Sequence, residues 1–111
     1  MSRSLFALIA VTPAVAACQL WATPPADRFG QPPADDAVLA AGKLVYDTHC
    51  ARCHGLDGKD DTYPFIATLD GIGKRYSLDR ILEETWATGF VAPQQFSPEQ
   101  QRAMAAYVAT L

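Results

Sequence analysis

The chain has 111 residues, is 50% hydrophobic, and carries 12 acidic against 9 basic side chains, for a net charge of −3 at pH 7. This length suits one domain, and the sequence has no internal repeat or second domain boundary. The acidic balance argues against nucleic acid as a partner, because binding to phosphates depends on clustered cations.

The first seventeen residues have the pattern of an export signal. Arg3 precedes an almost wholly apolar run from residue 5 to residue 17 that ends in small side chains, which is a charged region followed by a short hydrophobic region. The run is shorter than the about 20 apolar residues of a transmembrane helix, and Pro13 interrupts it. We therefore predict a signal peptide over residues 1–17.

The next residue is a cysteine in a recognisable setting. Val15-Ala16-Ala17-Cys18 resembles the lipobox of bacterial lipoproteins, in which the cysteine is acylated and becomes the first mature residue. The resemblance implies a lipid anchor at Cys18 on the periplasmic side of a bacterial membrane, with more than one acyl chain for stable attachment. The alternative is an ordinary signal peptide, with Cys18 a chance neighbour of the cleavage site.

Residues 18–36 contain two proline pairs, at residues 24–25 and 32–33. Proline-rich segments favour extended conformations, which suits a linker between the lipidated cysteine and a folded domain. An arm that lies partly ordered on the domain is the other interpretation.

Two helices are predicted in the first part of the domain, which covers residues 37–111. Asp35 and Asp36 can cap a helix that runs from Ala37 towards Cys50, with apolar side chains at three-and-four spacing. Ser77 opens a second helix that continues to about Thr88.

A third helix is predicted from its first residues. Ser97-Pro98-Glu99-Gln100 combines an N-cap serine, a proline at the first helical position and a glutamine three residues on, which is a capping box. We expect this helix to run to the C-terminus. Nothing in the chain alternates like a strand followed by a crossover helix, so the predicted fold class is all-α.

The most informative motif is Cys50-Ala51-Arg52-Cys53-His54. Its C-x-x-C-H spacing is that of covalent haem attachment, in which each cysteine reaches one vinyl group and the histidine lies under the iron. The motif predicts one covalent haem c, bound through Cys50 and Cys53, with His54 as axial ligand. Structural zinc needs four ligands, for which only Cys18 and His49 remain, and a redox dithiol belongs in a βαβ setting; both are weaker alternatives.

Together with Gly55 and the following Asp57-Gly58-Lys59, this segment resembles the attachment region of single-haem c-type cytochromes, over about residues 35–111. The resemblance implies a small helical domain of three or four helices around one haem. It also implies that the first and last helices cross closely, with Gly42, Tyr46 and Tyr107 at the crossing. A domain this small needs such a cofactor, because its own core is marginal.

The chain departs from that family at the sixth iron position. The family usually supplies a methionine just before a proline in the loop that leads into the last helix, and here Ala92 precedes Pro93. Met104 is one candidate for the sixth ligand, although a methionine on an apolar helix face is usually core. The sequence does not choose between it and other side chains that can reach the distal face: Lys59, Lys74, Tyr63, Tyr76, Gln94 and Gln95. His49 is a poorer candidate, because it adjoins Cys50 on the proximal side.

Three functions follow from this departure. The first is electron transfer with a redox partner protein, as a membrane-tethered carrier or as a subunit of a redox complex. The second is a five-coordinate haem that binds a diatomic gas or a small oxidant, and the third is a haem that only stabilises an interaction module. We favour electron transfer over enzymatic turnover, because the sequence offers no obvious acid–base pair and its loops are short for a substrate pocket.

Overall fold

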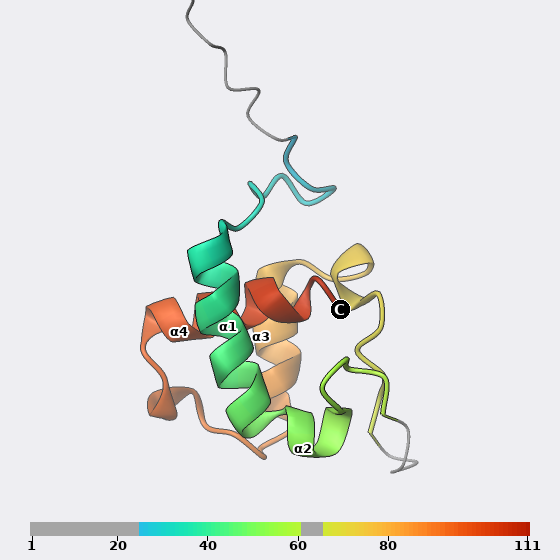
Figure 1. The fold of residues 1–111 in the computed structure, drawn as a ribbon, viewed down its shortest axis with the longest axis vertical. Helices are drawn as coiled ribbons and strands as arrows, with labels where there is room; N and C mark the ends of the chain where they lie inside the picture. Colours follow the sequence, from blue (N-terminus) through green and yellow to red (C-terminus); the bar gives the residue numbers. More distant parts are fainter. Residues whose placement is uncertain (1–24, 61–65) are drawn as a thin grey trace, which may run out of the picture.

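A computed structural model describes residues 25–60 and 66–111. All regular elements in these ranges are helical, which confirms the predicted fold class: α1 (Asp36–His49), α2 (Ala51–His54), η1 (Ile72–Lys74), α3 (Leu78–Ala87), η2 (Pro93–Gln95) and α4 (Pro98–Val108) (Figure 1). No helix in the described ranges has the length and apolar character to cross a bilayer. The predicted signal peptide and Cys18 lie outside the described residues.

Side-chain caps fix where α1 and α3 begin. The Asp35 carboxylate accepts a hydrogen bond from the Val38 amide at 2.9 Å, and the Ser77 hydroxyl accepts one from the Arg80 amide at 3.2 Å. Each cap satisfies an amide of the first turn that has no partner within the helix. Both predicted starts are thereby confirmed to within one residue.

Helix α4 begins with the predicted capping box and ends earlier than expected. The Ser97 hydroxyl accepts from the Gln100 amide at 3.1 Å, and the Gln100 side chain accepts from the Ser97 amide at 2.9 Å. The helix stops at Val108 rather than at the C-terminus. The Leu111 carbonyl instead accepts a hydrogen bond from the Gly71 amide at 2.8 Å, so the last residues join the chain just before η1.

Helices α1 and α4 cross in close contact at a glycine. A Cβ atom at Gly42 would lie 1.9 Å from the Ala103 carbonyl oxygen and 2.8 Å from the Tyr107 Cβ. The Tyr46 and Tyr107 rings meet beside this point, with centroids 5.4 Å apart. The predicted crossing of the first and last helices is therefore confirmed, together with the three residues assigned to it.

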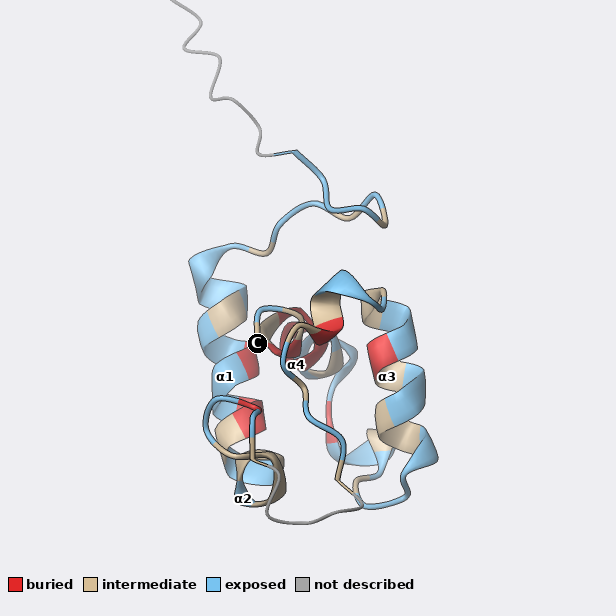
Figure 2. Ribbon diagram, turned by 90° about the vertical axis from the view of Figure 1, so that its right-hand side faces the viewer, coloured by how far each residue is buried: buried red, intermediate tan, exposed pale blue. Residues whose placement is uncertain are grey.

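The core lies between this crossing and helix α3 (Figure 2). Its buried side chains come from α1, η1, α3, the segment before α4, and α4 itself: Val45, Tyr46, Ile72, Ile81, Phe96, Met104, Ala105 and Val108. Helix α3 contributes Ile81 as its buried residue. The core is small, as expected for a domain that relies on a cofactor to complete its interior.

The described part of the arm forms a turn that touches the domain. The Asp27 carboxylate accepts hydrogen bonds from the amides of Phe29 and Gln31, at 2.8 and 2.9 Å. The Arg28 guanidinium donates to the Lys74 carbonyl in η1. The arm is therefore fastened to the domain at a point distant in sequence.

Gly42→Ala tests the helix crossing. Alanine is favoured over glycine in a helix by about 1 kcal/mol, so a purely local effect would stabilise the protein. We expect instead a loss of about 2 kcal/mol or more in the free energy of unfolding, because the methyl group forces α1 away from α4. Denaturant unfolding of the haem-loaded protein measures this free energy. Ala41→Gly on the exposed side of α1 is the control, because it reports the difference in helix propensity alone. An unchanged or raised stability would contradict the close contact.

Candidate functional site

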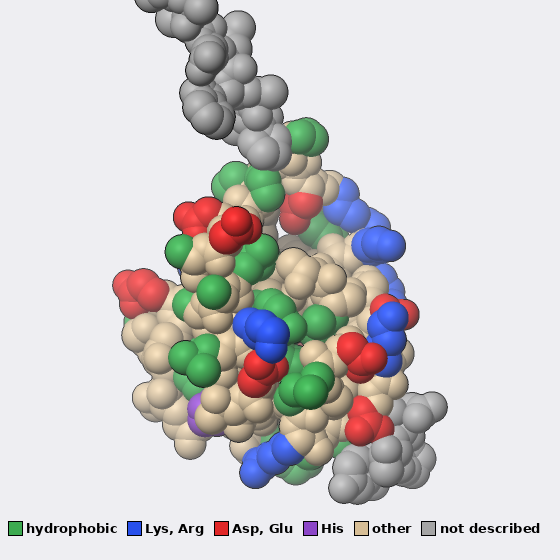
Figure 3. Space-filling model, in the orientation of Figure 1, with side chains coloured by type: hydrophobic (Ala, Val, Ile, Leu, Met, Phe, Trp, Pro, Cys, Tyr) green, Lys and Arg blue, Asp and Glu red, His purple; other side chains and the backbone are tan. Residues whose placement is uncertain are grey.

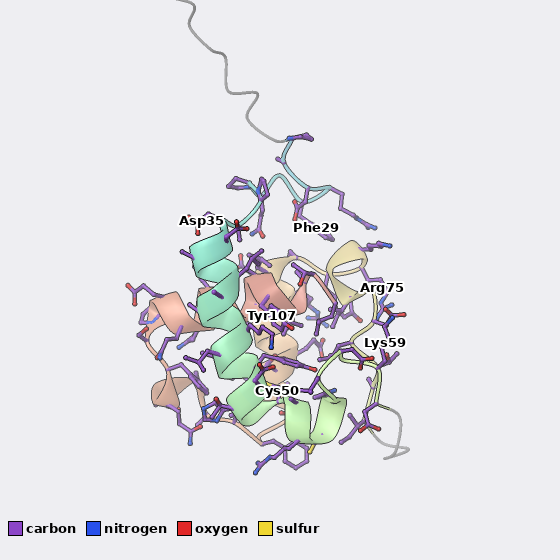
Figure 4. The ribbon with its side chains drawn as sticks, in the orientation of Figure 1. Phe29, Asp35, Cys50, Lys59, Arg75 and Tyr107 are labelled. Carbon is purple, nitrogen blue, oxygen red and sulfur yellow. The ribbon has the colours of Figure 1, made fainter. Side chains whose placement is uncertain are left out.

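The two cysteines of the motif lie on one tight turn at the junction of α1 and α2. The Cys50 amide continues the hydrogen bonding of α1 by donating to the Tyr46 carbonyl at 2.8 Å. The Cys50 carbonyl in turn accepts from the amides of Cys53 and His54, at 3.1 and 3.0 Å. One carbonyl group therefore holds the second cysteine and the histidine in a fixed relation to the first cysteine, Cys50, which Figure 4 labels between α1 and α2.

Both thiols are free and half-buried. Burial raises the pKa of the Cys50 thiol, an effect that the charge of Arg52 opposes and that Cys53 reinforces. Cys50 is therefore a protonated thiol at neutral pH. A pair of free thiols on one turn is the arrangement that two thioether bonds to one macrocycle require.

His54 has the protonation state of a metal ligand. Its pKa is lowered because burial penalises the imidazolium form. A hydrogen bond to the backbone of Ala67 opposes this effect and acts to raise the pKa. Its Nδ1 atom is buried and has no hydrogen-bond partner among the described residues. A neutral imidazole is the form that binds iron. An unpartnered ring nitrogen on the residue after the second cysteine therefore fits a haem ligand.

Tyr46 anchors the end of the attachment turn by a hydrogen bond, a role that the sequence analysis missed. Its side chain is 0% exposed, and its hydroxyl donates to the Gly55 carbonyl at 2.6 Å. Burial raises the pKa of this hydroxyl to about 12, so it remains a donor at all physiological pH values. A buried tyrosine usually needs a partner for its hydroxyl, and that need was the available signal.

The loop before α4 is where the family would place its second ligand. Ala92 is exposed and precedes the short turn η2. The Gln101 side-chain amide donates to the carbonyls of Pro93 and Phe96, at 3.0 and 3.2 Å, which fastens the second half of the loop to α4. Met104 is 2% exposed and belongs to the core cluster. This position does not test its ligation of iron, which stays a prediction.

A row of rings connects the end of α1 with α3. The His49 ring meets the Phe96 ring edge-on at 4.9 Å, and Phe96 stacks on Trp86 at 6.2 Å. His49 is exposed and packs against the end of the loop that begins at Gly89. His49 therefore serves as a packing residue at the end of α1.

The chemistry of these residues matches covalent haem. In the described ranges, no group of three or more His, Cys, Asp or Glu side chains is placed to hold a metal ion, whereas a closed zinc site needs four ligands. Haem iron needs one or two axial ligands from the chain, since the porphyrin supplies the rest. A helical domain with paired thiols and a neutral histidine on one turn defines the class of c-type haem proteins.

The family comparison agrees with this class. A family model described as cytochrome c matches residues 39–111, and the chain belongs to the cytochrome c family. It is thus a haem-based electron-transfer protein that binds haem c covalently through the Cys50 and Cys53 pair. No curated protein matches the chain, and no solved structure matches it either.

Replacing either cysteine by alanine tests the attachment. Cys50→Ala and Cys53→Ala should each greatly reduce covalent haem, and should leave the domain poorly folded because its core is small. Haem that survives denaturing electrophoresis, and the cooperativity of thermal unfolding, measure the two effects. Arg52→Gln, between the cysteines, is the control and should retain both. A well-folded, cooperative domain without haem would contradict the dependence on the cofactor.

Tyr46→Phe tests the support beneath the turn. Loss of the hydroxyl leaves the Gly55 carbonyl without its donor, and we expect a cost of about 1 to 2 kcal/mol in the free energy of unfolding. Tyr107→Phe is the matched control, because the Tyr107 hydroxyl has no hydrogen bond to the described residues. Equal costs for the two variants would show that the bond to Gly55 contributes nothing specific.

Proposed function

We propose that this protein carries single electrons between redox proteins at the periplasmic face of a bacterial membrane. The observation that carries the proposal is the turn that places Cys50, Cys53 and a neutral His54 around one carbonyl. Haem bound there supplies reversible one-electron chemistry, and His54 would be its axial ligand.

The surface around the turn supports contact with a redox partner. Leu56, two residues after His54, is 72% exposed. Arg52, on α2, is exposed as well. An apolar side chain beside a cation is the composition of many transient protein contacts. A partner that docks here approaches the attached haem directly, and the chain's own residues need perform no acid–base step.

The tether rests on the N-terminal sequence. Acylation of Cys18 would anchor the protein, and residues 18–36 would connect the anchor to the haem domain. In this proposal the lipid provides the attachment. The protein then acts as a tethered carrier or as a subunit of a larger redox complex.

Optical spectra test electron transfer against gas binding. The second function is favoured by one observation, which is that Ala92 stands in the loop where the family usually has methionine. For a carrier we expect a low-spin spectrum of the wild type that carbon monoxide leaves unchanged. Met104→Leu conserves the core volume, so a low-spin spectrum that persists in this variant would place the sixth ligand on another residue. High-spin iron with rapid carbon monoxide uptake would favour the gas-binding function. A change to high spin in Met104→Leu alone would identify Met104 as the sixth ligand.

Cys18→Ser tests the tether. The substitution removes the acylation site, and it should move the protein from the membrane fraction to the soluble periplasmic fraction without altering the haem spectrum. Fractionation and mass spectrometry of the mature N-terminus measure this. Continued membrane association of Cys18→Ser would point to an uncleaved signal or to a membrane-bound partner.

A further inference from the structure

Cations that lack a carboxylate partner gather where the arm meets η1. Elsewhere in the described ranges, lysine and arginine side chains mostly form ion pairs: Lys43 with Asp47, Lys59 with Asp70, Arg80 with Glu83 and Glu84, and Arg102 with Asp79. Arg28, Lys74 and Arg75 form no ion pair with the described residues, and all three are exposed. We call these three residues the cationic corner.

Backbone contacts hold the cationic corner together without neutralising it. The Arg28 guanidinium donates to the carbonyl of Lys74 and lies over the Phe29 ring, 4.9 Å from its centroid. The Arg75 guanidinium donates to the Asp70 carbonyl at 3.2 Å. Carbonyl oxygens satisfy these donors but carry no net charge, so the positive charge of both groups remains available to a ligand.

The carboxylates nearest in the chain are already engaged. Asp27 accepts hydrogen bonds from two backbone amides of its own turn. Asp70 pairs with Lys59 at 3.4 Å. Asp27 keeps its negative charge, because backbone amides do not neutralise it, but the three cations outnumber it. The corner is therefore a positive region on a chain whose total charge is −3. Figure 3 shows lysine and arginine side chains along the edge of the domain below the arm.

The cationic corner lies at the end of the domain from which the chain continues towards the proposed lipid anchor. The arm and η1 lie at one end of the domain, and α2, which carries the haem attachment turn, lies at the other end in two perpendicular views (Figures 1 and 2). The chain runs back from the arm towards Cys18. Six residues, 19–24, separate the described arm from Cys18. The seven Cα–Cα steps from residue 18 to residue 25 span at most about 25 Å, so in the proposed tether the arm lies close to the membrane surface.

We propose that the cationic corner binds the headgroups of anionic phospholipids. Each lysine or arginine near an anionic surface contributes attraction that falls off within a Debye length, whereas the acidic side chains of the protein are repelled. The contact orients the domain, with the attachment turn facing the aqueous phase. This inference adds to the proposed tethered carrier, and the lipid contact can be measured without the tether.

Vesicle binding of the haem-loaded Cys18→Ser protein without its predicted signal, residues 18–111, tests the corner without the acyl anchor and without the apolar run of residues 5–17. We expect co-sedimentation at low salt with vesicles of equal parts phosphatidylglycerol and phosphatidylcholine, and much less with phosphatidylcholine alone. Lys74→Gln/Arg75→Gln should weaken the partition coefficient by about fivefold for each cation removed. Salt at about 0.15 M should weaken it further, because ions screen exposed charges.

Arg102→Gln is the control, because it removes one positive charge on α4 that lies outside the cationic corner and is already paired with Asp79, and it should change the partition coefficient by less than about twofold. Absence of binding by the parent, equal binding to both vesicle types, or equal losses from the control and the corner variants would each overturn the proposal. Haem spectra and reducibility of the same samples distinguish this from failure of the carrier function. Normal redox behaviour without vesicle binding would reject the lipid contact alone.

Discussion

The contact between Gly42 and the Ala103 carbonyl determines the geometry of the domain. Helix α1 ends at the attachment turn, and α4 begins directly after the loop that contains Ala92. Because the two helices meet backbone to backbone with no room for a methyl group, the position of one fixes the position of the other. The proximal turn and the opposite loop are therefore held in register by a single crossing point.

Tyr46 carries this constraint into the site. It packs against Tyr107 at the crossing and donates its hydroxyl to Gly55 at the end of the turn. The same side chain thus serves the core and the attachment segment. The interior alone stabilises a chain of this size only marginally. A buried side chain that contributes both to the core and to the attachment turn therefore matters more here than in a larger domain.

Local chemistry explains what could be predicted from the sequence. Asp35, Ser77 and Ser97 each marked a helix start, because a cap acts on amides only a few residues away, and the C-x-x-C-H spacing located the thiols on one turn. Contacts between distant segments gave no such local signal, and the crossing of the first and last helices was expected only from the family resemblance. The bond from Arg28 to the Lys74 carbonyl spans 46 residues, and the end of α4 was displaced because Leu111 bonds to Gly71 instead. Both depend on how the elements pack, which no local pattern encodes.

The uneven fastening of the loop before α4 has a consequence for how this protein can diversify. Gln101 secures the carbonyls of Pro93 and Phe96, and Phe96 is buried against neighbouring rings, whereas Phe90 is 81% exposed. Between these points Val91 packs against the core, whereas Phe90 and Ala92 are exposed. Substitutions of Phe90 or Ala92 therefore alter the surface of this loop while the helical scaffold stays constant.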